Sequence, residues 1–477
     1  MKLQTWRLRQ VAKVLGENYS ASLGATLAYL ISHGFLLACW NALFWDDWVP
    51  YSRDSPFVRS FFGESQFNSV PFRGTYESWF IAIGPWSMRL AIFLIWPATA
   101  FCLSKLLREL HVLPERTSRT ITLMFLLIPA YGARVALINF TSQFSVFLFV
   151  LGSWLVLRTS LIHQCIGVIA LSVSLFFPSL QVFISVTFAL AVWLRWRSGM
   201  RWGSLFHPTL LIIIVLPWFH RYAVPWLAPS LRTDETGYNA VSVLYLLRAL
   251  STTTILFVPL VLTLRRASQT RSPDLGVWLV AVGSALVGVG SFPYMAVGHF
   301  MTLTDWILPF LPDASDWYSR HQILQTFGLS ILLTGIAHCF GKYQRTFSVL
   351  VIVLSIALNV SIYSRYYLDS LKQQAFIEAV ATEAPEIRDG DAIVIVDDAW
   401  KLNARRRAVR PNEWRGLMYR ATGHEVLIDA ESLNFCLEEN PRYKYSIFAG
   451  SRWRALLQNK VDLWLIIEEI PICRDLK

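Results

Sequence analysis

The sequence predicts a polytopic, all-α bundle in a membrane, followed by a small α/β domain. The 477-residue chain is 54% hydrophobic and only 16% charged, which is too apolar for an ordinary soluble enzyme of this size. Apolar runs of about 17–25 residues, the length that a bilayer needs, recur along its first three quarters. Because the composition changes sharply after residue 363, we expect a membrane domain at 1–363 and a second domain at 364–477.

We expect about eleven transmembrane helices, with Trp and Tyr clustered at their ends as at a membrane interface. The N-terminal segment is basic and amphipathic, and no small-residue cleavage site follows the first apolar run, so this run is expected to stay as a helix. The predicted spans are 20–43, 86–104, 119–135, 142–157, 161–176, 179–194, 207–224, 241–264, 275–296, 321–340 and 347–363.

Charges in the loops predict the orientation of the bundle. With the N-terminus in the cytoplasm, the inner segments carry 17 Lys and Arg and the outer loops carry 7, as the positive-inside rule requires. An odd number of spans then places the C-terminal domain in the periplasm or outside the cell. The acidic residues have the opposite distribution: 10 of the 14 Asp and Glu in the first 363 residues lie on the predicted outer side of the membrane. This asymmetry indicates a reaction face on the outer side.

Four apolar stretches predict the strands of the C-terminal domain: GDAIVIVDD, GHEVLIDA, YSIFAG and VDLWLIIEE. LDSLKQQAFIEAVATEAP and SRWRALLQN predict helices. Asp397 and Asp398 end the first strand, and we interpret them as a solvated strand end because no phosphate loop or nucleophile motif accompanies them. Cys436 and Cys473 lie in this domain and are able to pair if it stands outside the cell.

Several classes of function are disfavoured. The formal charge of +11 does not predict a nucleic-acid partner, because the positive residues are spread over many short loops. None of the six cysteines has C-x-x-C spacing, and no GxGxxG, Walker or HExxH motif is present.

The pair Asp46–Asp47 directly follows the first predicted span, between Trp45 and Trp48. Two adjacent carboxylates beside lipid repel each other and lose hydration, which is costly unless a cation, a metal ion or a proton compensates. Desolvation and repulsion also raise the pKa of one of them toward the range of a general base. We therefore expect the pair to be functional, with a divalent cation left open.

Further candidates lie in the first outer loop, 44–85. It is long for a loop, which is typical of functional or disordered segments, and its many aromatic residues argue against disorder. We expect short amphipathic helices on the membrane, and Arg73 and Glu77 are its candidate polar residues.

A late outer loop, 295–322, contains His299 and ends in Arg320 and His321. An arginine on the side that the positive-inside rule disfavours indicates an anionic partner, and its planar fork suits a phosphate. Arg134 lies near the outer half of its predicted helix, where it either lines the same polar cavity or pairs with acidic residues.

The chain resembles the GT-C superfamily of membrane glycosyltransferases in four features taken together. These are the acidic pair after the first span, the long first outer loop, the late outer loop with an arginine and the outer C-terminal domain. The "DDW" motif is similar to the polyprenyl-phosphate-dependent branch, which includes bacterial enzymes that glucosylate O-antigen. The resemblance covers 1–363.

The resemblance implies inverting transfer of a sugar from a polyprenyl phosphate to an acceptor hydroxyl on a glycan, a lipid-linked glycan or a protein. It implies Asp46 or Asp47 as catalytic base, Arg320 with His321 at the lipid phosphate, and Glu77 orienting the acceptor. A cofactor is not required, although Mg²⁺ or Mn²⁺ on the acidic pair is left open. Other substrate-binding candidates are Arg73, Arg134, His299, Trp45 and Trp48, where the two indoles either stack on a sugar or anchor the loop.

Three other functions stay open. A transporter or flippase of a lipid-linked sugar requires charged or broken helices near mid-membrane and an inverted repeat. An O-antigen-type polymerase or ligase uses a pyrophosphate-linked carrier with outer-loop Arg or His. A scaffold presenting the C-terminal domain leaves the acidic asymmetry unexplained.

Overall fold

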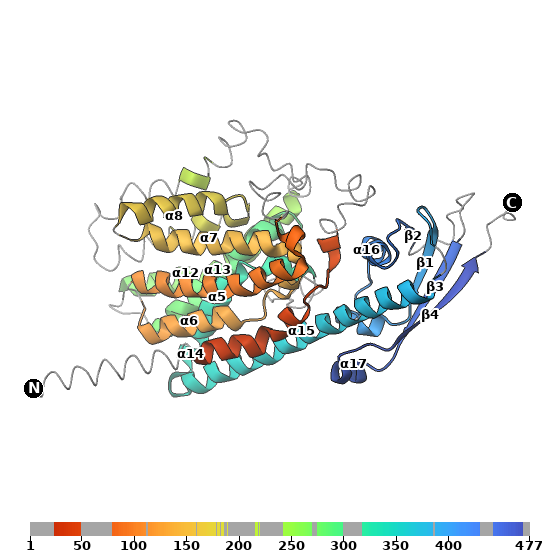
Figure 1. The fold of residues 1–477 in the computed structure, drawn as a ribbon. Coiled ribbons are helices and arrows are strands. Elements are labelled where there is room, and N and C mark those ends of the chain that lie inside the picture. Colours follow the sequence, from red (N-terminus) through yellow and green to blue (C-terminus); the bar gives the residue numbers. More distant parts are fainter. Residues whose placement is uncertain are drawn as a thin grey trace, which may run out of the picture.

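The computed structural model places most of the chain in a helical bundle that is joined to a small domain with a β-sheet (Figure 1). It describes residues 23–48, 79–110, 113–158, 160–177, 179–181, 183–185, 188, 215–217, 219, 242–269, 274–298, 317–384, 387–429 and 442–470.

The described bundle consists of α-helices interrupted by short 3-10 turns. The first helix covers Leu23–Ala38. The other helices are α5 (Pro85–Glu109), α6 (Glu115–Leu127), α7 (Phe140–Val156), α8 (Leu161–Ser174), α12 (Val243–Gln269), α13 (Leu275–Ala296), α14 (Gln325–Cys339) and α15 (Gln344–Glu383). The 3-10 turns are η1 (Trp45–Asp47), η2 (Gly132–Val135), η3 (Leu137–Asn139), η6 (Trp317–Gln322) and η7 (Gly341–Tyr343).

Five helices among the described residues are long and apolar enough to cross a membrane, and Leu23–Ala38 and Leu161–Ser174 are shorter apolar helices. This agrees with a membrane protein, although it is far fewer than eleven spans. The predicted spans 179–194 and 207–224 lie mostly outside the described residues.

One predicted span, 119–135, is wrong in its extent. Helix α6 ends at Leu127, and Ile128 is extended, with ψ 126°. Pro129 follows, and a proline pushes the residue before it out of the helical region. The freed segment forms η2 and η3, which bring Arg134 and Ile138 to the end of the bundle.

Helices α13 and α14 approach closely through glycine. A Cβ atom at Gly283 or Gly328 would overlap the backbone of the opposing helix. Small residues that let two backbones touch are typical of helix pairs in membranes.

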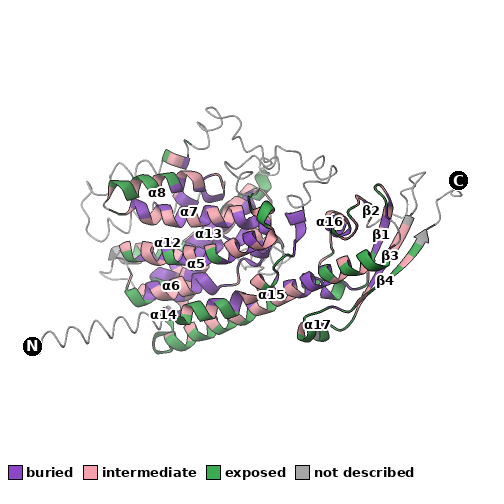
Figure 2. Ribbon diagram, in the orientation of Figure 1, coloured by how far each residue is buried: buried purple, intermediate pink, exposed green. Residues whose placement is uncertain are grey.

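Helix α15 is continuous over 40 residues and runs through the boundary predicted at 363/364. The predicted span 347–363 and the predicted helix LDSLKQQAFIEAVATEAP are therefore one element. No Gly or Pro interrupts the sequence between Lys342 and Ala384, and the helix stops just before Pro385. Its first half is largely exposed, as a lipid-facing helix would be, and its second half is more buried (Figure 2).

The C-terminal domain contains a four-stranded sheet in the order β2-β1-β3-β4. Strand β1 (Ala392–Asp397) is parallel to β2 (Leu427–Asp429) and to β3 (Arg442–Ala449), whereas β4 (Leu463–Ile470) is antiparallel to β3. All four predicted strands and the helix α17 (Arg452–Gln458) are thereby confirmed.

The remaining elements of this domain are η8 (Trp400–Leu402), η9 (Ala404–Arg406) and α16 (Pro411–Thr422). Helix α16 was not predicted, although its sequence has the usual signals: Pro411 at its first position and Gly423, with φ 78°, after its end. It packs against α15 and against η1 at the end of the bundle. The two cysteines expected to pair, Cys436 and Cys473, lie outside the described residues.

Candidate functional site

Four 3-10 turns from distant parts of the chain meet at the end of the bundle that faces the C-terminal domain. The Ile138 amide of η3 donates to Asp47 Oδ1 of η1 at 2.8 Å. The Ala133 amide of η2 donates to Ser319 Oγ of η6 at 2.7 Å, and Asn139 Nδ2 ties η3 back to η2. We call η1, η2, η3 and η6 the turn cluster. It brings together Asp47, Arg134 and the Arg320–His321 pair, which the sequence nominated separately.

Asp47 is completely buried. Its Oδ2 accepts the Phe44 amide at 3.1 Å, in addition to the Ile138 bond on Oδ1. Burial raises the pKa of Asp47 to about 7, although the Arg89 guanidinium and the backbone N–H groups act to lower it. The pKa shift has the direction that the sequence analysis expected. Because the side chain is enclosed and both oxygens hold backbone groups, Asp47 fixes the shape of η1.

Arg89 on α5 also stabilises the backbone around η1 and η2. It is fully buried, and its guanidinium donates to the carbonyl oxygen of Ala42 at 2.6 Å and to that of Val135. Its positive charge therefore lies between the segment before η1 and the end of η2.

Asp46 has its backbone in η1, but its side chain lies outside what the structure describes. Among the described residues there is no group of three or more His, Cys, Asp or Glu side chains that could hold a metal ion. The divalent cation on the acidic pair therefore stays a prediction.

Trp45 and Trp48, which were expected either to stack on a sugar or to anchor the loop, have protein neighbours on their rings. Both are buried. Trp45 lies 5.5 Å from the Tyr366 ring, with the Arg407 guanidinium 5.3 Å away. The ring of Trp48 packs on α16 at Gly416. The two indoles therefore anchor the turn to α15 and the C-terminal domain.

Arg320 and His321 are adjacent in η6, and Arg320 Nε donates to His321 Nε2 at 3.1 Å. The His321 ring is buried, with the Tyr294 ring 4.7 Å away. Arg320 is half-buried, so its guanidinium lies at the edge of the turn cluster.

Arg134 points into the bundle. It is 1% exposed, donates through Nε to the Tyr131 carbonyl at 3.1 Å, and lies 4.4 Å from the Trp96 ring. Among the described residues it has no carboxylate partner, and its Nη1 has no hydrogen-bond partner. A buried cation without a counter-ion is costly, so this guanidinium is suited to an anion that the described residues do not supply.

Other buried polar atoms near Arg134 also have no close hydrogen-bond partner among the described residues. They belong to His33, Tyr131, Gln143 and Gln322, of which Tyr131 and Gln143 lie next to each other. The charge of Arg134 acts on His33 and on Tyr131, and Gln322 lies in η6, which packs on η2. We call His33, Tyr131, Arg134, Gln143 and Gln322 the interior polar cluster. Buried polar groups are nearly always satisfied, so this cluster is expected to bind water or a polar ligand.

Three nominated residues are not placed. Arg73 and Glu77 of the first outer loop and His299 of the late outer loop lie outside the described residues, as do 49–78 and 299–316 around them.

Asp397 differs from its interpretation as a solvated strand end. Lys372 Nζ, on the buried face of α15, donates to both Asp397 carboxylate oxygens and to Asn403 Oδ1, each at 2.6 Å. This lysine occupies the carboxyl end of β1, so Asp397 serves to dock the strand on the helix.

The sequence analysis missed two residues of the C-terminal part: Glu413, which bonds η1 at Trp45, and Gln373, which bonds Leu43 just before η1. No sequence pattern predicts these contacts, because each joins residues more than three hundred positions apart. Gln143 has a local signal, since it is an amide directly before the apolar run FSVFLFV.

Comparison with models of known protein families, with curated proteins and with solved structures found no match.

Proposed function

We propose that this protein is an inverting glycosyltransferase that moves a sugar from a polyprenyl phosphate to an acceptor hydroxyl at the outer face of a membrane. One observation supports this most: the turn that contains Asp46 and Asp47 lies in the same cluster as Arg134 and the Arg320–His321 pair. The reaction needs a proton acceptor and a cationic partner for a departing phosphate, and the turn cluster contains both.

The proposal includes eleven spans, a cytoplasmic N-terminus and a C-terminal domain outside. The charge bias of the loops supports this orientation. The packing of α16 on η1 also supports it, because it puts the C-terminal domain on the side of the acidic pair.

In the proposed reaction, a carboxylate takes the proton of the acceptor hydroxyl, and the hydroxyl oxygen attacks the anomeric carbon at the same time. The bond from that carbon to the lipid phosphate breaks, and the phosphate leaves with the electron pair. Attack opposite the leaving group inverts the anomeric centre. Guanidinium groups stabilise the charge that develops on the phosphate, and Arg134 and Arg320 are the candidates.

The two aspartates receive different roles in this proposal. Asp47 is enclosed and holds two backbone amides, so an acceptor hydroxyl has no access to it without movement of η1. We therefore assign proton abstraction to Asp46 and the positioning of η1 to Asp47.

The test is transfer from radiolabelled polyprenyl-phosphate sugars to cell-envelope acceptors by protein reconstituted in proteoliposomes. General-base catalysis contributes about 10²–10⁴-fold, so Asp46→Asn should lower the rate by about that factor. Asp398→Asn, at an exposed position of the C-terminal domain, is the matched control and should retain the wild-type rate. Full activity of Asp46→Asn, Asp47→Asn and the double variant would falsify the assignment.

A second candidate function is transport of a lipid-linked sugar. The observation in its favour is the interior polar cluster, because ionisable residues buried inside a membrane bundle are typical of translocation pathways. The discriminating measurement uses the same proteoliposomes: a transporter moves the labelled lipid across the bilayer without consuming it, whereas a transferase releases the free lipid phosphate.

A further inference from the structure

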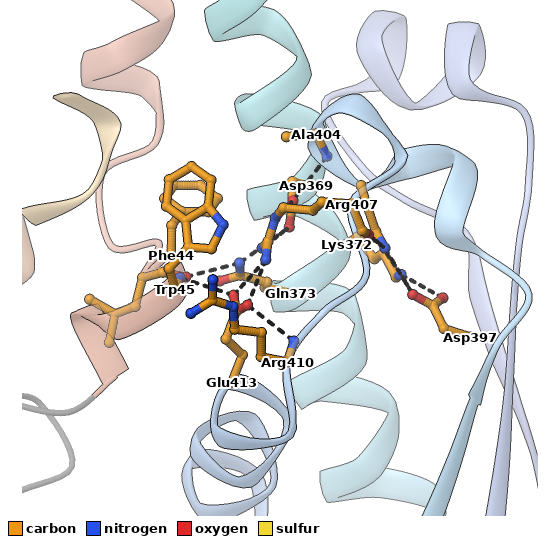
Figure 3. Close-up of polar contacts among 12 residues, drawn as sticks. Phe44, Trp45, Asp369, Lys372, Gln373, Asp397, Ala404, Arg407, Arg410 and Glu413 are labelled. Atoms are coloured by element: carbon orange, nitrogen blue, oxygen red, sulfur yellow. Dashed lines mark hydrogen bonds and ion pairs between the residues drawn. The ribbon is translucent and has the colours of Figure 1, made fainter. Parts of the chain in front are cut away.

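The backbone of η1 is held by side chains that come from the far end of the chain. Asp369 and Gln373 lie one turn apart on α15, Arg407 follows η9, and Glu413 lies in the first turn of α16. Figure 3 shows these four side chains converging on Phe44 and Trp45. We call Asp369, Gln373, Arg407 and Glu413 the junction network.

Arg407 is the centre of the junction network. Its Nη1 donates to Glu413 Oε1 at 2.6 Å and to Oε2 at 2.8 Å, and its Nε donates to Asp369 Oδ2 at 3.0 Å (Figure 3). Both carboxylates are at most 1% exposed. Although burial opposes the charged form, Asp369 and Glu413 hold the pKa of Arg407 above its ordinary value. Each buried charge in this network is therefore compensated by a neighbour.

Two members of the network reach the main chain beside the acidic pair. Glu413 Oε2 accepts the Trp45 amide at 3.1 Å, across 368 residues of sequence. Gln373 Nε2 donates to the Leu43 carbonyl at 3.0 Å. The peptide groups on either side of Phe44 are thus fixed by the C-terminal part of the chain, directly before Asp46 and Asp47.

Trp45 itself has an unusual backbone. Its φ is 53°, in the left-handed region that a bulky residue rarely adopts. Such a strained conformation persists only where the surroundings hold it in place. The bond from its amide to Glu413, the Arg407 guanidinium over its ring and the Tyr366 ring beside it are the contacts that do so.

From these observations we infer that Glu413 and Gln373 are positioning residues, which set the backbone of η1 and so the direction of its carboxylates. Arg407 and Asp369 act through them by fixing the Glu413 carboxylate. The inference rests on the proposed function, since positioning matters for the rate only if η1 carries out chemistry. In this inference, the C-terminal domain supplies residues that position the candidate site of the membrane domain.

The chain contains a matched control for this inference. Lys372, on the same helix and one turn from Asp369, forms a second polar group with Asp397 of β1 and with Asn403. It joins α15 to β1, and among the described residues it has no hydrogen bond to 43–47, although Asn403 Nδ2 also donates to the Arg407 carbonyl oxygen. The control is therefore taken at Asp397, whose loss weakens the contact of β1 with α15 without removing a bond to η1.

The experiment measures amide hydrogen exchange of the segment 43–48 in the full-length protein, together with kcat and KM of transfer. The variants are Glu413→Gln, which puts an amide beside the Arg407 guanidinium, and Gln373→Met, which removes the Leu43 bond without changing a charge. Asp397→Asn is the control. Loss of a hydrogen bond to a charged group should speed exchange of the Trp45 amide by about tenfold or more in Glu413→Gln.

Support for the inference is faster exchange at 43–48 in the two junction variants but not in Asp397→Asn. Together with this, kcat should fall by up to about 10²-fold at unchanged KM, as expected for a misplaced reacting group. Unchanged exchange in both junction variants, or equal acceleration in all three, overturns it. If Glu413→Gln does not fold, Gln373→Met decides. An absence of transfer by the wild-type protein contradicts the proposed function alone, because the exchange data still report on the positioning of η1.

Discussion

Two buried polar regions lie close together in this molecule and differ in one respect. In the junction network, the carboxylates of Asp369 and Glu413 and the Arg407 guanidinium are paired at hydrogen-bond distance. In the interior polar cluster, Arg134 and His33 have polar atoms without partners among the described residues. Paired groups stabilise the fold by themselves, whereas unpaired ones need a partner from beyond the described residues. The junction network therefore joins two parts of the protein, and the interior polar cluster is a candidate site for a ligand.

The largest effect is expected at the centre of the paired region. Arg407→Met leaves two buried carboxylates without a cation, and breaking a buried pair in this way costs about 3–5 kcal/mol. Equilibrium unfolding in mixed micelles should show this loss of the free energy of unfolding. Asp398→Asn, at an exposed position, should stay within about 0.5 kcal/mol of the wild type. A similar, small change in both variants would contradict the pairing of Arg407.

The opposite pattern is expected for the unpaired region. Arg134→Met removes a buried cation that has no carboxylate partner among the described residues, so the free energy of unfolding should not fall. Transfer should fall by about 10²–10³-fold, because a donor aimed at developing charge is lost. The control is Arg119→Met, which breaks the exposed pair with Glu115 and should leave transfer unchanged. A loss of stability at Arg134 as large as that at Arg407 would remove the distinction between the two regions.

Asp47 lies between these extremes, since it has hydrogen bonds but no ion pair among the described residues. Its pKa is about 7 in the folded protein and 3.8 ordinarily. Between these values the folded protein keeps a proton that the unfolded chain has released. The free energy of unfolding should therefore fall as the pH rises from about 4 to about 7, by at most about 1.4 kcal/mol per pH unit, and then level off. Thermal unfolding across this range should show the slope, and Asp47→Asn should reduce it; an unchanged slope in that variant would assign it to other groups.

The smallest effect concerns the apolar contact between the two parts of the molecule. A Cβ atom at Gly416 on α16 would overlap the Trp48 ring, and overpacking of this kind costs about 1–3 kcal/mol. Gly416→Ala should lower the midpoint of thermal unfolding, and adding Trp48→Leu should recover part of the loss. Additive losses in the double variant would show that the two residues do not contact each other.

The sequence analysis predicted elements better than it predicted their junctions. Alternating apolar residues and turn signals gave the strands β1 to β4, because such patterns are local. Pro129 is likewise a local signal, and it marks the end of α6. The contact between Trp45 and Glu413 has no local signal in the sequence. The two residues lie 368 positions apart, and neither belongs to a periodic pattern that would point to the other.

Only part of the candidate site could be predicted, because the sequence shows local chemistry and not contacts between distant residues. Asp47, Arg134 and Arg320 were nominated for their chemistry and their expected side of the membrane, and the structure brings them into one cluster of turns. The unpaired state of Arg134 depends on what surrounds it in three dimensions, which composition does not report.

Helix α15 has one consequence for the spacing of the chain. At 1.5 Å and 100° per residue, its 40 residues form a single rod of about 60 Å in which position along the axis and direction around it are linked. One residue inserted between Tyr363 and Asp369 would turn Asp369, Gln373 and the domain that follows them about a quarter-circle away from Leu43 and Trp45. Four inserted residues would nearly restore their direction but carry them about 6 Å farther along the axis. Insertions and deletions are therefore tolerated least in this short stretch, whatever residues are inserted.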